Sequence, residues 1–153
     1  MIMYQSFSQF QKKQFGTLAE DHVSSLLEKL SDIPSLKCPR RIFDLEWNGN
    51  RIEVKSAQLC RSGTATNGRY NYHGFTTYRN QVRSMIKHQG FFAFVLMISD
   101  ELVSVKFLSA EETEKHIVKY GKKHKMRIKM SVFYDSLSPE KFVEEHLTDR
   151  YLP

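Results

Sequence analysis

Asn48-Gly49 separates two segments in which apolar and polar residues alternate, and this dipeptide constrains the fold more than any other feature. The segments are RIFDLEW (41–47) and NRIEVKSAQL (50–59), and alternation of this kind is typical of half-buried strands. Asn-Gly between such segments favours a type I′ turn, because both turn residues must adopt positive φ. The sequence therefore predicts an antiparallel hairpin.

The two-residue turn also predicts which residues of the hairpin face each other. Trp47 is expected opposite Asn50, and counting outward places Asp44 opposite Glu53, with Lys55 two residues along the strand. One face would then be polar and the other would belong to the core. The expected polar face consists of Ile42, Asp44, Glu46, Arg51, Glu53 and Lys55, and the expected core face of Phe43, Leu45, Trp47, Ile52 and Val54.

Two opposed carboxylates repel each other unless a cation lies between them. We predict that Asp44 and Glu53 bind a divalent metal ion, with the backbone carbonyl of Val54 as a further ligand. Such an ion can polarise a phosphodiester and lower the pKa of a bound water molecule. Lys55 would position or deprotonate that water, or neutralise charge on the phosphate. The alternative is a solvated strand face whose charges only pair with one another.

These residues resemble the signature of the PD-(D/E)xK nuclease superfamily, an Asp followed on the next strand by (D/E)-x-K, here Asp44 and Glu53-Val54-Lys55. Phe43 stands where the nominal Pro would be, a position that the superfamily varies. The helix and hairpin at the start of the chain are similar to those of small group I intron homing endonucleases and archaeal-type Holliday junction resolvases. The resemblance covers residues 15–59 and, more loosely, residues 78–108.

The resemblance implies a restriction-endonuclease-like α/β fold, a mixed central sheet flanked by helices, with Mg²⁺ as cofactor and Mn²⁺ as an expected substitute. Many members add a Glu on the first helix, which gives Glu20 a catalytic role; an exposed helix carboxylate is the alternative. Some relatives carry a site-supporting Gln on a later helix, where this chain has Gln81. The predicted catalytic residues are Glu20, Asp44, Glu53 and Lys55.

Periodicity and capping residues predict the elements of the rest of the chain. Helices are expected over about 8–30, over 78–89 with Gly90 closing the helix, from Ser109 to about Tyr120, and after Ser138-Pro139; two strands are expected within 91–108, an edge strand over 126–134, and a long loop or irregular hairpin over 60–77. This order indicates an α/β class with a mixed sheet. The length of 153 residues predicts a single domain, 1–153.

The segment after the hairpin interleaves arginines with aromatic residues, a mixture suited to a nucleic-acid surface. The net charge of +6 also favours polyanionic partners. The predicted nucleic-acid-binding residues are Arg69, Tyr70, Tyr72, His73, Tyr78, Arg79, Gln81 and Arg83. The alternative is a hairpin whose tyrosines only cover the core. A second basic segment, residues 119–129, is expected to be a solvated face.

Taken together, these features predict a Mg²⁺-dependent DNA endonuclease that cuts double-stranded or branched DNA. The polar loop favours a specific duplex site, of the homing or restriction type, whereas a compact chain without a further recognition domain favours a Holliday junction. A non-catalytic nucleic-acid-binding module and a protein-interaction subunit are the alternatives from other classes. The intact Asp44, Glu53 and Lys55 count against the first of these, and the Asp44–Glu53 pair counts against the second.

Two further expectations concern assembly and location. Scissile phosphates in two-fold-related positions predict a homodimer or homotetramer. No apolar run reaches the roughly 18 residues of a membrane span, and the first ten residues lack the pattern of an export signal. A cytoplasmic protein that contacts no membrane is therefore expected.

Overall fold

The computed structural model describes residues 9–39, 42–61, 70–72, 75–98, 101–119, 125–129 and 131–148. Helices and strands mix along the chain, so the predicted α/β class is confirmed. The helices are α1 (Gln9–Ser31), α2 (Arg79–Lys87), α3 (Ala110–Glu114), α4 (Val132–Asp135) and α5 (Pro139–Thr148). The strands are β1 (Leu36–Lys37), β2 (Leu45–Trp47), β3 (Asn50–Arg61), β4 (Tyr70–Tyr72), β5 (Phe75–Tyr78), β6 (Phe91–Ile98), β7 (Glu101–Ser109), β8 (Ile117–Lys119) and β9 (Lys125–Ile128). None of these helices is long and apolar enough to cross a membrane.

The Asn-Gly hairpin joins β2 to β3 as predicted. Asn48 and Gly49 have φ values of 47° and 79°, the positive angles that a type I′ turn requires. The antiparallel register starts with Trp47 opposite Asn50, which is the predicted pairing. The local sequence was therefore sufficient to predict this hairpin.

β3 is the central strand of the main sheet, whose order is β1-β2-β3-β6-β7 with β4 paired to β3. β3 runs parallel to β6 but antiparallel to β2 and β4, so the sheet is mixed. A parallel pair needs a long crossover, and here the crossover contains β4, β5 and α2. The segment 60–77 is thus partly strand: β4 and β5 lie within it, and residues 62–69 and 73–74 lie outside the described chain.

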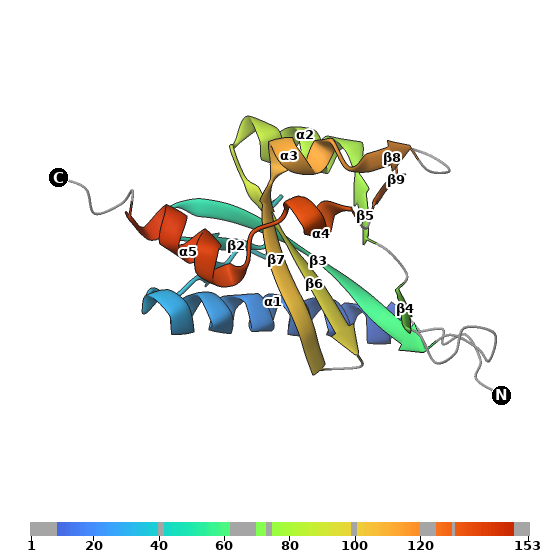
Figure 1. The fold of residues 1–153 in the computed structure, drawn as a ribbon, viewed down its shortest axis with the longest axis horizontal. Coiled ribbons are helices and arrows are strands. Elements are labelled where there is room, and N and C mark those ends of the chain that lie inside the picture. Colours follow the sequence, from blue (N-terminus) through green and yellow to red (C-terminus); the bar gives the residue numbers. More distant parts are fainter. Residues whose placement is uncertain are drawn as a thin grey trace.

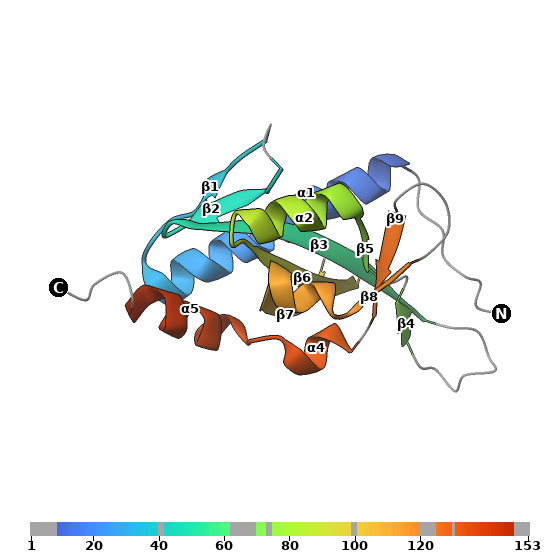
Figure 2. The same cartoon turned by 90° about the horizontal axis from the view of Figure 1, so that it is seen from above.

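Helices lie on both sides of the main sheet (Figures 1 and 2). On one side, α1 and α5 cover a first core that includes Leu45, Trp47, Ile52, Ala93, Val95 and Phe107. On the other side, α2, α3 and the small β5-β9-β8 sheet cover a second core that includes Phe75, Val82, Met85, Phe92, Phe94 and Ile128. β6 contributes to both cores and is therefore buried on both faces.

Phe43 belongs to the second core and not to the first, so its predicted place on the face of Trp47 is wrong. The guanidinium carbon of Arg51 lies 5.4 Å from the centre of the Phe43 ring, on the face that the prediction reserved for polar residues. The alternation fails at Phe43 because this residue lies before β2, outside the paired and extended part of the hairpin.

α2 ends in a left-handed residue, but this residue is Gln89 and not Gly90 as predicted. Gln89 has φ 53°, and the Gly90 N–H donates to the Met85 carbonyl at 2.7 Å. The Gln89 N–H donates to the Ile86 carbonyl at 3.0 Å, which completes the paired bonds of a Schellman motif. Gly90 is used instead for close packing: a Cβ there would lie 2.4 Å from the Met85 methyl and 3.2 Å from the Arg51 carbonyl.

The segment after β7 differs most from the prediction. Ser109 caps α3 as expected, with its Oγ accepting the Glu112 N–H at 3.1 Å, but the helix ends at Glu114 and not near Tyr120. β8 follows and pairs with β9, which lies in the middle of the small sheet. The predicted edge strand over 126–134 is therefore wrong in two respects: β9 ends at Ile128 and has a strand on each side, and Val132–Asp135 form α4. The β-branched pair Ile117-Val118 suits a strand, and the ladder to β9 overrides the local helical pattern.

α5 follows the prediction closely. The Lys141 N–H donates to the Ser138 Oγ at 3.2 Å, so Ser138 is the N-cap. Phe142 is fully buried, and its ring stacks on Phe107 with centroids 4.3 Å apart. Val143 and Leu147 also face the first core, as their helical spacing indicated.

Candidate active site

β3 carries the two central residues of the candidate site on the side of the sheet that α2 covers. Glu53 lies beside Phe92 of β6 and Lys55 lies beside Phe94, and both aromatic side chains belong to the second core. Because these rings surround the strand, only 5% of the Glu53 surface is exposed. The predicted spacing of a carboxylate and an ammonium group on one strand face is therefore confirmed, in an environment much drier than a solvated face.

Asp44, the residue just before β2, also lies at this site. The paired register ends at Leu45, so the predicted rung between Asp44 and Glu53 is absent from the ladder. The Asp44 N–H donates instead to the Ile52 carbonyl at 3.0 Å, and its Oδ2 accepts the Val54 N–H at 2.8 Å. This second bond holds the Asp44 carboxylate against the backbone of β3, next to Glu53.

Gln81 of α2 connects the acidic and basic side chains. Its Nε2 donates to Glu53 Oε2, and its Oε1 accepts from Lys55 Nζ at 2.6 Å and from Thr77 Oγ1 at 3.1 Å. Lys55 Nζ also lies 3.5 Å from Glu53 Oε2. Gln81 was predicted as a nucleic-acid-binding or site-supporting residue, and the structure places it inside the carboxylate cluster. Thr77 was not predicted; its spacing of four residues from Gln81 is the only signal that the sequence offers.

The electrostatics of the cluster are dominated by burial. Burial and a hydrogen bond with the Asp44 carboxyl raise the pKa of Glu53 to about 9, against the opposing effect of the nearby Lys55 ammonium. Glu53 Oε1 is buried and has no hydrogen-bond partner within the described residues. A negative charge on Glu53 therefore requires a cation that the surrounding side chains do not fully supply.

Glu20 of α1 lies at the margin of this cluster. Burial raises the pKa of its carboxyl, and the negative charge of Asp44 raises it further, while the charge of Lys37 lowers it. Lys37 itself forms an ion pair with Asp21. The predicted catalytic residues Glu20, Asp44, Glu53 and Lys55 are thus electrostatically connected, and the charge of Asp44 links Glu20 to the other three.

The donor set suits a hard divalent cation bound through few protein ligands. Within the described chain, no three His, Cys, Asp or Glu side chains converge closely enough to hold an ion by themselves. Mg²⁺, however, keeps several water ligands and uses one or two carboxylates, a number that Asp44 and Glu53 provide. The N–H and C=O of a strand residue point to the same edge, so the Val54 carbonyl points to the side of the strand where its N–H meets Asp44. The unpartnered Glu53 oxygen is a further available ligand atom.

Of the other predicted nucleic-acid-binding residues, Arg79 and Arg83 point away from the carboxylates. Arg69 and His73 lie outside the described residues, and Tyr70 and Tyr72 belong to β4, which pairs with the end of β3. Tyr78, just before α2, is 56% exposed. Arg79 and Arg83 lie on the side of α2 opposite Gln81, where they line a separate pocket between α2, α3, β8 and β9.

Fold and site together define a mixed α/β protein with a buried carboxylate–lysine–glutamine cluster at the start of its central hairpin. No family model matches the chain, and no curated protein matches it.

Proposed function

We propose that this protein is a Mg²⁺-dependent DNA endonuclease with a restriction-endonuclease-like fold. One observation carries the proposal: the Glu53 carboxyl lies in contact with the Asp44 carboxyl and 3.5 Å from the Lys55 ammonium, although burial opposes charge at this place. Proteins retain such an arrangement where it serves binding or chemistry, because two acids and a lysine under an aromatic core cost folding free energy. The motif resemblance of Asp44 and Glu53-Val54-Lys55 supports the same assignment.

In this proposal, Asp44, Glu53 and the Val54 carbonyl hold the metal ion. When bound, the ion polarises the scissile phosphodiester and makes a water molecule more acidic. Glu53 and Asp44 are acceptors at fixed positions, because β3 and the Val54 N–H hold them in place. Lys55 neutralises negative charge that develops on the phosphate, or takes a proton from the attacking water. Gln81 fixes the direction of the Lys55 ammonium.

For the substrate, we favour a specific duplex site over a Holliday junction. The Tyr/Arg/Asn-rich segment between β3 and α2 offers polar side chains that could read base edges. A four-way junction is the second candidate, and a nucleic-acid-binding module without activity is the third. We propose a cytoplasmic setting for this activity.

Cleavage assays distinguish these candidates. The protein is incubated with a plasmid library that carries randomised inserts, and with a synthetic four-way junction, each with Mg²⁺ and with EDTA. Mg²⁺-dependent cuts that share one sequence support the specific endonuclease, and cuts restricted to the junction support the resolvase. Binding to either DNA without Mg²⁺-dependent cleavage would contradict the proposal of an enzyme.

Variants then test the site itself. Asp44→Asn and Lys55→Ala should abolish cleavage while circular dichroism and DNA affinity stay close to those of the unmodified protein. Lys87→Ala is the matched control, because Lys87 is an exposed basic residue at the other end of α2. Full activity of either site variant would show that the cluster is not the active centre.

Assembly is the second part of the proposal. One cluster per chain can cut one strand at a time, so a symmetric pair of chains is the simplest way to cut two strands of opposite polarity. We propose a homodimer, or a homotetramer made from two dimers. Sedimentation equilibrium with and without DNA measures the state directly. A strict monomer that cuts both strands in a single binding event would contradict it.

A further inference from the structure

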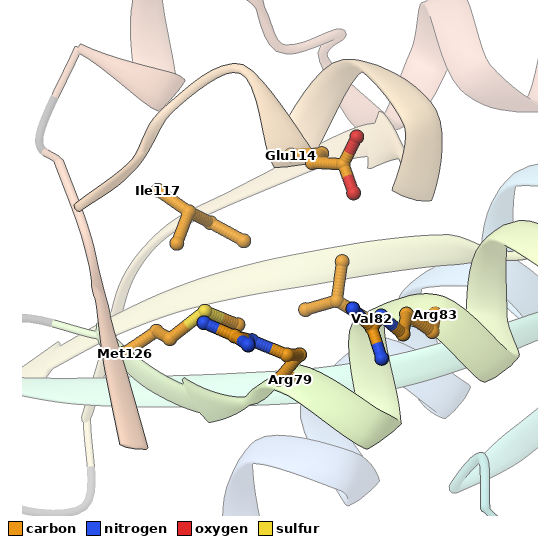
Figure 3. A pocket seen from close by; sticks show the side chains of 6 residues that line it. All are labelled: Arg79, Val82, Arg83, Glu114, Ile117 and Met126. Carbon is orange, nitrogen blue, oxygen red and sulfur yellow. The ribbon is translucent and has the colours of Figure 1, made fainter. Parts of the chain in front are cut away.

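A second site lies on the far side of α2 from the carboxylate cluster. A pocket of about 230 Å³ opens there between α2, the α3–β8 segment and β9 (Figure 3). Its lining residues are Arg79, Val82, Arg83, Glu114, Ile117 and Met126. The proposed cleavage mechanism uses none of them.

One wall of the pocket is positively charged. Arg79 and Arg83 are four residues apart on α2, so both project from the same side of the helix. Neither guanidinium forms an ion pair within the described part of the chain, and Glu114 stands on the opposite wall (Figure 3). Paired guanidinium groups are well suited to a phosphate, which they can bind through two parallel hydrogen bonds each.

The space between the charged walls is apolar. Val82 and Met126 are 2% and 8% exposed, and Ile117 is half-buried beside them. A flat ring fits such a surface well, because aliphatic groups and a methionine thioether contact ring faces and edges favourably. The pocket therefore separates an anion-binding wall from an apolar floor.

Glu114 completes the pattern on the wall opposite the two arginines. Its carboxylate would repel a phosphate placed beside it, so an anionic ligand is expected to bind at the arginine wall. A carboxylate does accept hydrogen bonds from an exocyclic amino group, as Asp and Glu do from the N4 amino group of cytosine. Phosphate, ring and amino group are the three parts of a single nucleotide whose base carries an amino group.

We propose that this pocket binds one unpaired nucleotide through its phosphate and its amino-bearing base, cytosine before thymine. The phosphate contacts Arg79 and Arg83, the ring lies on Val82, Ile117 and Met126, and the base amino group donates to Glu114. The nucleotide belongs either to a single strand of DNA or to a free nucleoside monophosphate, since both present the same groups. The site is separate from the carboxylate cluster, so it does not depend on the cleavage proposal.

Fluorescence anisotropy in EDTA tests the pocket without any cleavage. Labelled oligo(dC) and oligo(dT) of equal length are titrated with the protein, and unlabelled dCMP is added as a competitor. Oligo(dC) should bind about tenfold more tightly than oligo(dT), the difference that one charge-assisted hydrogen bond can supply. Displacement by dCMP assigns the pocket to free nucleotides, and binding without displacement assigns it to strands.

Three variants assign the contacts. Arg79→Gln and Arg83→Gln should each weaken the binding of both oligonucleotides by about tenfold. Glu114→Gln should remove most of the preference for dC while leaving dT binding unchanged. Lys87→Gln is the control, because it removes one exposed positive charge from the same helix outside the pocket. Equal affinity for dC and dT, or an equal loss in the Lys87→Gln variant, would overturn the proposal.

Discussion

The side-chain oxygen of Gln81 accepts a hydrogen bond from the Lys55 ammonium at 2.6 Å, although 26 residues separate the two in sequence. The amide nitrogen of the same Gln81 donates to Glu53, so one amide group orients both an acid and a base. α2 thereby fixes side chains that β3 alone would leave free to rotate. This contact makes Gln81 the positioning residue of the candidate site.

Replacement of Gln81 by Ala should lower the rate of DNA cleavage by roughly 10- to 100-fold, the usual cost of losing an outer-shell partner in a metal site. The Lys55 ammonium would lose its acceptor, so DNA affinity should change little while the pH–rate profile shifts. Single-turnover cleavage across a pH series measures both effects. Asn80→Ala is the matched control, since Asn80 is the exposed neighbour on the same helix; an equal loss in both variants would argue for a structural effect only.

Stability without metal should fall as pH rises. Because the pKa of Glu53 is raised from 4.5 to about 9, the folded state holds a proton in this range that the unfolded state has released. The free energy of unfolding in EDTA should therefore decrease between these two pH values and level off above them. The raised pKa of Glu20 acts in the same direction.

Chemical denaturation in EDTA at several pH values checks this dependence, and Glu53→Gln should flatten the curve. Mg²⁺ should raise the melting temperature more at about pH 8 than at about pH 5, because the ion binds the ionised carboxylates. A melting temperature that Mg²⁺ leaves unchanged at every pH would contradict the proposed metal site.

Trp47 should be important for stability and not for chemistry. Its side chain is fully buried, and its Nε1 donates to Ser31 Oγ at 3.1 Å and to the Ile33 carbonyl at 3.2 Å. Trp47→Ala should lower the free energy of unfolding by roughly 3–5 kcal/mol, the cost of truncating a buried aromatic residue. Urea denaturation measures the loss. Trp47→Phe keeps most of the ring volume and should lose clearly less, and a similar loss in both would place the energy in the hydrogen bonds.

Gln89→Gly should stabilise the protein. Gln89 adopts φ 53°, a conformation that costs a residue with a Cβ roughly 1–2 kcal/mol. Glycine avoids this strain, but it loses more backbone entropy on folding, which offsets part of the stabilisation. The expected increase in the free energy of unfolding is about 0.5–1 kcal/mol. Urea denaturation compares this variant with Gln89→Ala, which keeps a Cβ and should show no increase.

The features that the sequence determined by itself are those governed by neighbouring residues. The type I′ turn at Asn48-Gly49 depends only on the two φ angles that these residues tolerate, so the register of β2 and β3 followed from counting. The caps at Ser109 and Ser138 are similarly local. The spacing of Glu53 and Lys55 on one strand face followed from the period of an extended chain.

Only the tertiary structure decided what surrounds these residues. Gln81 approaches Glu53 because the parallel β3–β6 pair needs a crossover, and this crossover brings α2 over β3. The number of residues between Glu53 and Gln81 does not predict how close the two side chains lie in the folded protein. The same helix directs Arg79 and Arg83 away from the carboxylates, although each is only two residues from Gln81 in the sequence. Residues 117–119 became strand because β9 offered a ladder, and a long-range backbone partner outweighs local helix propensity.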